Sequence, residues 1–186
     1  MGYTTEFFGT FEVTPKLSKD DSAFLKSFNQ TRRMKRNLCE LKYGIEGEWF
    51  VEGKGQLGQE NDKSVMDHTA PPRTQPGLWC QWIPNDDDTG IKWDDGEKFY
   101  HAEKWIAYLI DGFLAPKGYV VNGKVRAQGE DRGGQWTLSV RDNKVYRGSF
   151  LVNQELLENK PKPITELKQR KECNTCLTKL KCALTA

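Results

Sequence analysis

The sequence predicts an α+β fold in two layers, in which two helices pack on one face of an antiparallel sheet. Three observations support this prediction. Residues 4–13 alternate between the two faces expected of a half-buried strand, and residues 119–150 have the pattern of a three-stranded meander. Between them lie two stretches whose apolar residues recur at helical spacing.

The first strand is expected to end at Pro15, and a helix over residues 19–33 follows it. Ser18 stands three positions before Asp21, which resembles a capping box with Asp in place of Glu. Ala23, Phe24 and Phe28 then follow at helical spacing and predict the apolar face.

Residues 37–95 form the least regular part of the sequence and are rich in Gly, Pro and Trp. Long irregular segments in compact domains tend either to be functional or to contain short strands. We expect a strand over residues 48–52, and a hairpin in which 78–83 pairs with 91–93 across a polar turn.

The second helix has the clearest periodicity in the chain. Asp94 and Glu97 have the spacing of a capping box, and Pro116 and Gly118 provide a stop. Seven apolar residues between them fall on one face: Phe99, Ala102, Ile106, Leu109, Ile110, Phe113 and Leu114. That face is predicted to pack on the sheet.

The meander is expected to consist of strands 119–128, 135–141 and 144–150, with a tight turn at Asp142–Asn143. Trp136, Leu138 and Val140 alternate with polar neighbours, so one face of this sheet is predicted to be apolar and the other wet.

The domain is predicted to span residues 1–152, and residues 153–186 form an appendage. Pro161 and Pro163 indicate a linker, after which Leu and Cys residues fall on one face of a short amphipathic helix among lysines. A role of this tail in dimerisation is one interpretation that the pattern leaves open.

Composition excludes several classes of protein. Lys plus Arg total 28 against 26 Asp plus Glu, a formal net charge of +2, which is too small for the bulk electrostatics of a dedicated nucleic-acid binder. The start of the chain lacks the pattern of a secretory signal, and no apolar run is long enough to span a membrane. Five unevenly spread cysteines favour a reducing compartment, so we expect the cytoplasm.

One pattern points to zinc chemistry. His101 and Glu103 form an H-x-E sequence, and Cys173 and Cys176 form a C-x-x-C sequence, the two halves of a nucleobase-deaminase zinc centre. The match is partial, since Glu172 stands where that motif has Pro. Cys173, Cys176 and Cys182 are also candidates for a structural zinc site. The alternative without chemistry is that these thiols are buried as small apolar groups.

Cys80 is a second candidate for chemistry, as a nucleophile with His68 or His101 as its base. It lies between Trp79 and Trp82 in an apolar segment, and burial raises the pKa of a thiol. We therefore favour an inert core cysteine.

A surface for recognition is predicted from basic and aromatic residues. Aromatic and arginine side chains dominate binding hot spots, and indoles also stack on bases. The candidates are Arg32, Arg33, Lys35, Arg36, Trp49, Trp79, Trp82 and Trp93. Lys124, Arg126, Arg141 and Arg147, expected on the wet face of the sheet, extend the basic set; the alternative is an ordinary solvated surface.

Several motifs resemble a small uncharacterised protein family of bacteria and their phages. They are TRRMKR at 31–36, QPGLWCQW at 75–82, EKFY at 97–100, and the NG and GED turns within 119–131. The resemblance covers residues 1–150 and implies no activity. It suggests a protein encoded by a phage or a mobile element.

The leading hypothesis from the sequence is thus a non-enzymatic binding protein without a cofactor, which engages a host protein or a nucleoprotein, for example as an inhibitor. Nucleic acid would be contacted through a local basic patch. The alternative is a zinc-dependent enzyme acting on nucleotides or nucleic acid.

Overall fold

The structure is a computed structural model that describes residues 2–38, 41–51, 59–131 and 133–149. The predicted linker and tail helix, with Cys173, Cys176 and Cys182, lie outside the described residues, as does Cys39.

The main sheet is antiparallel and has the order β5-β6-β2-β7-β8-β9, with β1 also paired to β7. Its strands are β1 (Thr5–Phe8), β2 (Phe11–Thr14), β5 (Trp82–Pro84), β6 (Gly90–Trp93), β7 (Val120–Gly129), β8 (Gln135–Arg141) and β9 (Lys144–Ser149). The predicted α+β class is therefore confirmed. The three-stranded meander is present as β7–β9, and Asp142 and Asn143 both have positive φ at its tight turn.

The predicted first strand is broken in two. Gly9 has a φ of 118°, a value that side chains rarely tolerate, and it separates β1 from β2. Both halves nevertheless pair with β7, Thr5 opposite Gly129 and Thr14 opposite Val120. The alternation of residues 4–13 thus continues across the break, and Phe7, Phe11 and Val13 are all buried.

Helix α1 (Lys19–Gln30) begins where the capping pattern predicts. The Ser18 hydroxyl oxygen accepts a hydrogen bond from the Asp21 N–H at 3.1 Å. The helix ends three residues before the predicted Arg33, because Thr31 is extended. Leu25 and Phe28 are its fully buried residues facing the core, whereas Ala23 is exposed.

Helix α2 (Ala102–Leu109) continues through a π-helical turn, η4 (Ile110–Leu114), and a 3₁₀ turn, η5 (Ala115–Lys117). The prediction that Asp94 caps this helix is wrong. The Asp94 carboxylate instead accepts hydrogen bonds from the Gly96 N–H and the Asn29 amide, and Lys98 and His101 adopt left-handed φ values before the helix starts. The apolar periodicity located the buried face correctly, since Ile106, Leu109, Ile110 and Leu114 are fully buried.

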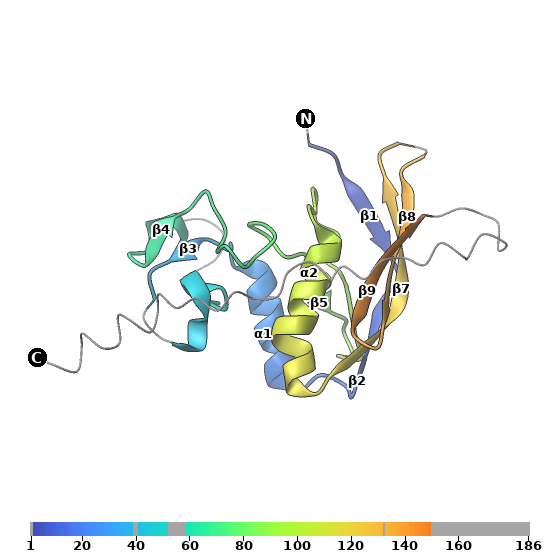
Figure 1. The fold of residues 1–186 in the computed structure, drawn as a ribbon, viewed down its shortest axis with the longest axis horizontal. Coiled ribbons are helices and arrows are strands. Elements are labelled where there is room, and N and C mark those ends of the chain that lie inside the picture. The colour runs from blue at the N-terminus through green and yellow to red at the C-terminus, as the bar shows by residue number, and fades with distance from the viewer. Residues whose placement is uncertain (1, 39–40, 52–58, 132, 150–186) are drawn as a thin grey trace, which may run out of the picture.

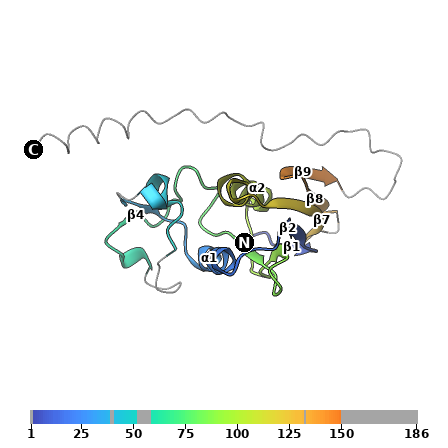
Figure 2. The same ribbon diagram turned by 90° about the horizontal axis from the view of Figure 1, so that it is seen from below.

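Apart from the β5–β6 hairpin, which joins the sheet, the described part of the irregular segment packs on the helices from the side opposite the sheet, as Figures 1 and 2 show together. It contains 3₁₀ turns η1 (Leu41–Tyr43), η2 (Ile45–Gly47) and η3 (Gln59–Asn61). Its strand β4 (Val65–Asp67) pairs with β3 (Lys35–Arg36), which directly precedes the segment, in a two-stranded ribbon. The predicted strand over 48–52 is wrong for its described part, because residues 48–51 follow η2 without strand pairing. The predicted 78–83 and 91–93 hairpin is present in a shorter form, β5 with β6.

Candidate functional site

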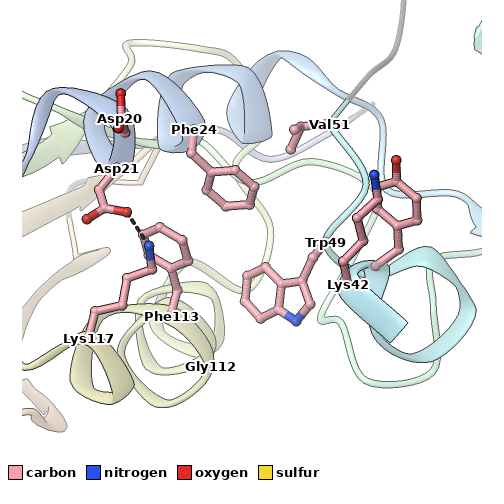
Figure 3. A pocket seen from close by; sticks show the side chains of 10 residues that line it. Asp20, Asp21, Phe24, Lys42, Trp49, Val51, Gly112, Phe113 and Lys117 are labelled. Atoms are coloured by element: carbon pink, nitrogen blue, oxygen red, sulfur yellow. Dashed lines mark hydrogen bonds and ion pairs between the residues drawn. The ribbon is translucent and has the colours of Figure 1, made fainter. Parts of the chain in front are cut away.

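An open cleft of about 520 Å³ lies where the irregular segment meets α1 and η4 (Figure 3). Three mutually packed aromatic rings from three parts of the chain form most of its apolar wall: Phe24 from α1, Phe113 from η4, and Trp49 from the irregular segment. Tyr43 and Val51 complete the lining. The charged residues around it are Asp20, Asp21, Lys42 and Lys117. We call this the aromatic cleft.

The rings of the aromatic cleft pack on one another. Phe24 and Phe113 are stacked with centroids 4.8 Å apart, and the Trp49 ring lies 6.5 Å from Phe24 and 6.2 Å from Phe113. Gly112 allows this approach, because a Cβ at that position would lie 2.6 Å from the Trp49 ring. The wall is therefore fixed by packing before anything binds.

Polar contacts hold Trp49 in position from behind. Its ring stacks on Tyr108 of α2, whose hydroxyl donates to the Glu48 carboxylate at 2.9 Å. The Ile45 N–H and the Thr74 hydroxyl donate to the same carboxylate. Burial, reinforced by the nearby Glu48 charge, raises the pKa of Tyr108, so its phenol remains a proton donor.

One end of the aromatic cleft is closed by an ion pair between Lys117 and Asp21 (Figure 3). The Asp21 carboxylate also accepts from Tyr119 at 2.7 Å and from the Ser18 hydroxyl at 2.8 Å. Burial raises the pKa of Asp21, but the bonds from Lys117, Tyr119 and Ser18 together outweigh it and lower the pKa below its ordinary value. This carboxylate is saturated, whereas the Asp20 carboxylate at the exposed rim forms no hydrogen bond or ion pair within the described residues.

The predicted basic surface is wrong at Arg33 and Arg36, which are both about 2% exposed. Arg33 donates to the carbonyls of Thr31 and Phe50 and lies over the Phe28 ring, 4.2 Å from its centroid. Arg36 pairs with Asp62 and lies over the Phe50 ring. Arg33 therefore joins the irregular segment to Phe28 of the core, whereas Arg36 ties parts of the irregular segment together. Of the four predicted basic residues only Arg32 and Lys35 remain half-exposed.

The predicted outward position of the tryptophans is wrong at Trp82 and Trp93. They are 1% and 8% exposed, because the β5–β6 hairpin directs both rings into the core against Phe7. Trp49 and Trp79 are half-buried, and each lines a cavity. These two keep the surface access that the binding hypothesis requires.

The wet face of the sheet also differs from expectation at one residue. Arg147 pairs across the sheet with the buried Leu138, so it lies on the helix side, where it contacts Glu103 and the Trp136 ring. Lys124, Arg126 and Arg141 lie exposed on the outer face as predicted, together with Lys144.

The two residues of the predicted H-x-E sequence, His101 and Glu103, lie in different surroundings. His101 lines a second cavity with Trp79, while Glu103 faces Arg147 with an Oε1–Nη1 distance of 3.6 Å. In the described residues no cluster of three or more His, Cys, Asp and Glu side chains has the arrangement of a metal site. The tail cysteines lie outside those residues, so the zinc hypothesis stays a prediction.

Cys80 is fully buried in the core. Burial raises the pKa of its thiol to about 12, which keeps the group protonated at neutral pH. A protonated, enclosed thiol is a poor nucleophile, which agrees with an inert core residue.

Sequence reasoning did not identify Phe24, Phe113 and Tyr108 as site residues. Phe24 and Phe113 fall within the helical periodicity and were expected simply to be core, and Tyr108 was not singled out at all. The site exists because the irregular segment packs back onto the helices. Gly112, a glycine inside a helical pattern, is the one sequence feature connected with this packing, and its meaning becomes clear only when Trp49 is known to lie against it.

In the described part of the chain, no helix combines the length and apolar character needed to cross a membrane. Comparison of the chain with models of protein families, with curated proteins and with solved structures finds no match to any of them.

Proposed function

We propose that this chain is a non-enzymatic binding protein that engages another protein through the aromatic cleft. It would be encoded by a phage or mobile element, act in the cytoplasm of a bacterial host, and engage a host protein or nucleoprotein, for example as an inhibitor. The observation that carries the proposal is the aromatic wall of the cleft beside Asp20, an acid without an ion pair among the described residues. In this wall Phe24 and Trp49 are half-exposed, and the largely buried Phe113 supports them.

The chemistry of the aromatic cleft favours a protein segment as its partner. Preassembled aromatic pockets of this kind accept an apolar anchor side chain at low entropic cost. Because Asp21 is already satisfied by three donors, Asp20 is the carboxylate left to attract the partner. The expected partner segment therefore carries a large apolar residue with a Lys or Arg next to it.

Site-specific photo-cross-linking tests this proposal. A photoreactive amino acid at position 23, exposed and one helical turn from Asp20, is expected to form one dominant cross-linked product in the bacterial host, and the change Phe24→Lys should abolish it. The same group at Lys124, on the opposite side of the molecule, serves as the matched control. Equal cross-linking from both positions, or a product that survives Phe24→Lys, would contradict the proposal.

The outer face of the sheet supports a second candidate, direct contact with single-stranded nucleic acid. Phe8 is 46% exposed, with the Arg126 guanidinium 5.0 Å from its ring centroid, and the surrounding cations are Lys124, Arg141 and Lys144. Exposed aromatic rings among cations can stack bases and pair with phosphates. Glu6 and Glu12 on the same face weaken this attraction.

An affinity measurement at increasing salt separates the two candidates. If the sheet face binds nucleic acid, affinity for an oligonucleotide falls steeply with salt, and Arg126→Ala reduces the slope. The absence of oligonucleotide binding at low salt would exclude this second candidate and leave the aromatic cleft.

The zinc-dependent enzyme remains an alternative hypothesis that rests on the sequence pattern alone. Metal analysis of the full-length protein tests it. Stoichiometric zinc that disappears on changing Cys173 and Cys176 to Ser would revive the hypothesis, and a zinc-free protein would end it.

A further inference from the structure

The aromatic cleft favours an occupant with two properties. Its half-exposed rings, Phe24 and Trp49, accept a large apolar side chain. The Asp20 carboxylate, at the α1 end of the cleft, forms no ion pair within the described residues and attracts a cation (Figure 3). A complementary segment therefore combines an apolar anchor with Lys or Arg beside it.

Residues 173–186, which lie outside the described residues, have both properties in their sequence. At helical spacing their apolar side chains fall on one face: Cys173, Cys176, Leu177, Leu180 and Leu184. Lys179 and Lys181 stand directly before and after Leu180, and residues 173–186 contain no Asp or Glu. We call this stretch the anchor segment.

The distribution of charge along the chain favours attraction of this segment to the domain. Residues 150–186 contain seven Lys and Arg against four Asp and Glu, a formal charge of +3 within a total of +2. Residues 1–149 therefore carry a formal charge of −1. A basic segment is thus joined to a slightly acidic domain, and salt should weaken the attraction between them.

The other described surfaces suit a basic segment less well. On the outer face of the sheet, Glu6 and Glu12 are outnumbered by exposed cations: Lys124, Arg126, Arg141 and Lys144. The second cavity has Lys98 and His101 in its lining against one acid, Glu97. Among these surfaces the aromatic cleft is the one that combines an aromatic wall with an acid that has no ion pair within the described residues.

The two lysines in the lining of the aromatic cleft leave this preference intact. Lys117 forms its ion pair with Asp21, so the charges of these two groups largely cancel. Lys42 lies over the Tyr43 ring, with its Nζ 4.5 Å from the ring centroid, and Figure 3 shows it at the end of the cleft away from α1. The α1 end of the cleft therefore keeps an acidic character through Asp20.

The anchor segment can reach the aromatic cleft from the end of the sheet. Strand β9 ends at Ser149, and residues 150–172 connect it to the anchor segment. A connection of 23 residues can span up to about 75 Å. A domain of this size is only about 40 Å across. Tethering at such a length gives an effective concentration of about 1 mM, so even weak intrinsic affinity produces substantial occupancy.

We propose that the anchor segment binds in the aromatic cleft of its own chain. Leu177 and Leu180 would lie against the aromatic wall, with Lys179 or Lys181 beside Asp20. The bound segment competes with a protein partner for the same surface and thereby regulates access to it. This inference rests on the proposed function, because regulation requires that the cleft also binds a partner.

Photo-cross-linking in the purified full-length protein tests this placement. A photoreactive amino acid at position 23 should form an intramolecular product with residues 173–186, identified by peptide mass spectrometry, in a yield that does not depend on protein concentration. The same group at Lys124 should give at least about fivefold less of it. A product that joins two chains, or the absence of any product with the anchor segment, would overturn the proposal.

Paired substitutions in the anchor segment test the apolar contact. Leu177→Asp together with Leu180→Asp should reduce the intramolecular product at least about tenfold, because two buried apolar side chains are lost. Thr175→Asp with Thr178→Asp makes the same change of charge on the opposite helical face and is the matched control. Equal loss in the two pairs would rule out anchoring through the apolar face.

A charge exchange tests the role of Asp20. Asp20→Lys should reduce the intramolecular product about two- to fivefold, the range expected for an exposed ion pair. Lys179→Glu with Lys181→Glu should restore it in that background, and an unchanged melting temperature would verify the fold. Without restoration, the pairing of this carboxylate with the anchor segment is wrong.

Cross-linking from position 23 in the bacterial host separates this inference from the proposed function. The Leu177→Asp, Leu180→Asp protein should give about threefold more host product than the parent, because the competitor is removed. A host product that does not increase would overturn the regulation. An intramolecular product without any host product would contradict the proposed function, whereas a host product without an intramolecular one would overturn only this inference.

Discussion

The indole of Trp49 stacks on the phenol ring of Tyr108 with centroids 4.9 Å apart and planes inclined by 19°. This contact joins the irregular segment to helix α2, and the Tyr108 hydroxyl secures it by donating to the Glu48 carboxylate. The position of Trp49 in the wall of the aromatic cleft is therefore stabilised by the Tyr108–Glu48 hydrogen bond, on the side of Trp49 away from the cleft.

Tyr108→Phe should keep the ring stack and remove that hydrogen bond. The Glu48 carboxylate loses one donor and the Gln75 amide loses an acceptor at 3.2 Å, so the free energy of unfolding should fall by about 1–2 kcal/mol. Denaturant unfolding measures the change. Tyr146→Phe on the outer sheet face is the control, expected within about 0.5 kcal/mol of the parent, and equal effects of the two changes would contradict the role of this bond.

Arg33→Met separates a structural role from a role in binding. Burial lowers the pKa of the Arg33 guanidinium to about 9, yet the side chain still bonds the Thr31 and Phe50 carbonyls. Its removal leaves these buried acceptors unpaired, and the free energy of unfolding should fall by about 2–4 kcal/mol. Lys35→Met should change it by less than about 0.5 kcal/mol. A fully stable Arg33→Met protein would show that the arginine is not structural.

Asp88 should make the protein sensitive to acid. Hydrogen bonds from Lys19 and Ser22 hold the pKa of this carboxyl at about 2, against an ordinary value of 3.8. Because the folded state has the lower pKa, the stabilisation is complete above about pH 4 and is lost as the pH falls toward 2. Melting temperatures between pH 2 and 7 should show this loss, and Asp88→Asn should be less stable near neutrality and less steep below pH 4. Asp86→Asn, in the same turn but exposed, should follow the parent curve.

Gly9→Ala should weaken the junction between β1 and β2. The φ of 118° is unfavourable for alanine, and the added Cβ would lie 3.1 Å from the Lys124 carbonyl oxygen. We expect a loss of about 1–3 kcal/mol in the free energy of unfolding, compared with almost none for Gly133→Ala. Equal stability of the two variants would mean that the backbone at position 9 can adopt its conformation without a glycine.

Cys80 should be unreactive in the native protein. With the other four cysteines changed to Ser, a thiol reagent at pH 8 should label Cys80 only after denaturation, because the group is buried and its pKa is about 12. Rapid labelling of the folded protein would contradict this and would restore the thiol as a candidate nucleophile.

Local signals in the sequence were sufficient for much of the fold. The Ser18–Asp21 cap and the Asp142–Asn143 turn depend on neighbouring residues, and both are found where they were predicted. The start of α2 was predicted wrongly because Asp94 bonds Asn29 of α1, a partner that is distant in sequence. Competition from such tertiary contacts is not visible in a local pattern.

The candidate sites were less predictable for a related reason. Composition indicated that tryptophans and arginines would contribute to binding, but it could not show which of them are exposed. Trp79 is half-exposed and Trp82 is buried. Likewise Arg32 is half-exposed, whereas its neighbour Arg33 is buried. Which of them faces solvent depends on the sheet partner and on how the irregular segment returns to the helices. The position of the Trp49 ring depends on the close approach that Gly112 allows and on the stack with Tyr108, neither of which can be read from the sequence.

The pairing of Thr5 with Gly129 sets an order of events during synthesis. When the first residues leave the ribosome, β7, which pairs with both β1 and β2 in the folded protein, has not yet been translated. Strand β2 can pair with β6 before that, but β1 must wait, unpaired, until β7 emerges, and contacts so far apart in sequence are slow to form. A nascent chain stalled before residue 120 should lack a protease-resistant core, whereas one released after residue 149 should acquire it.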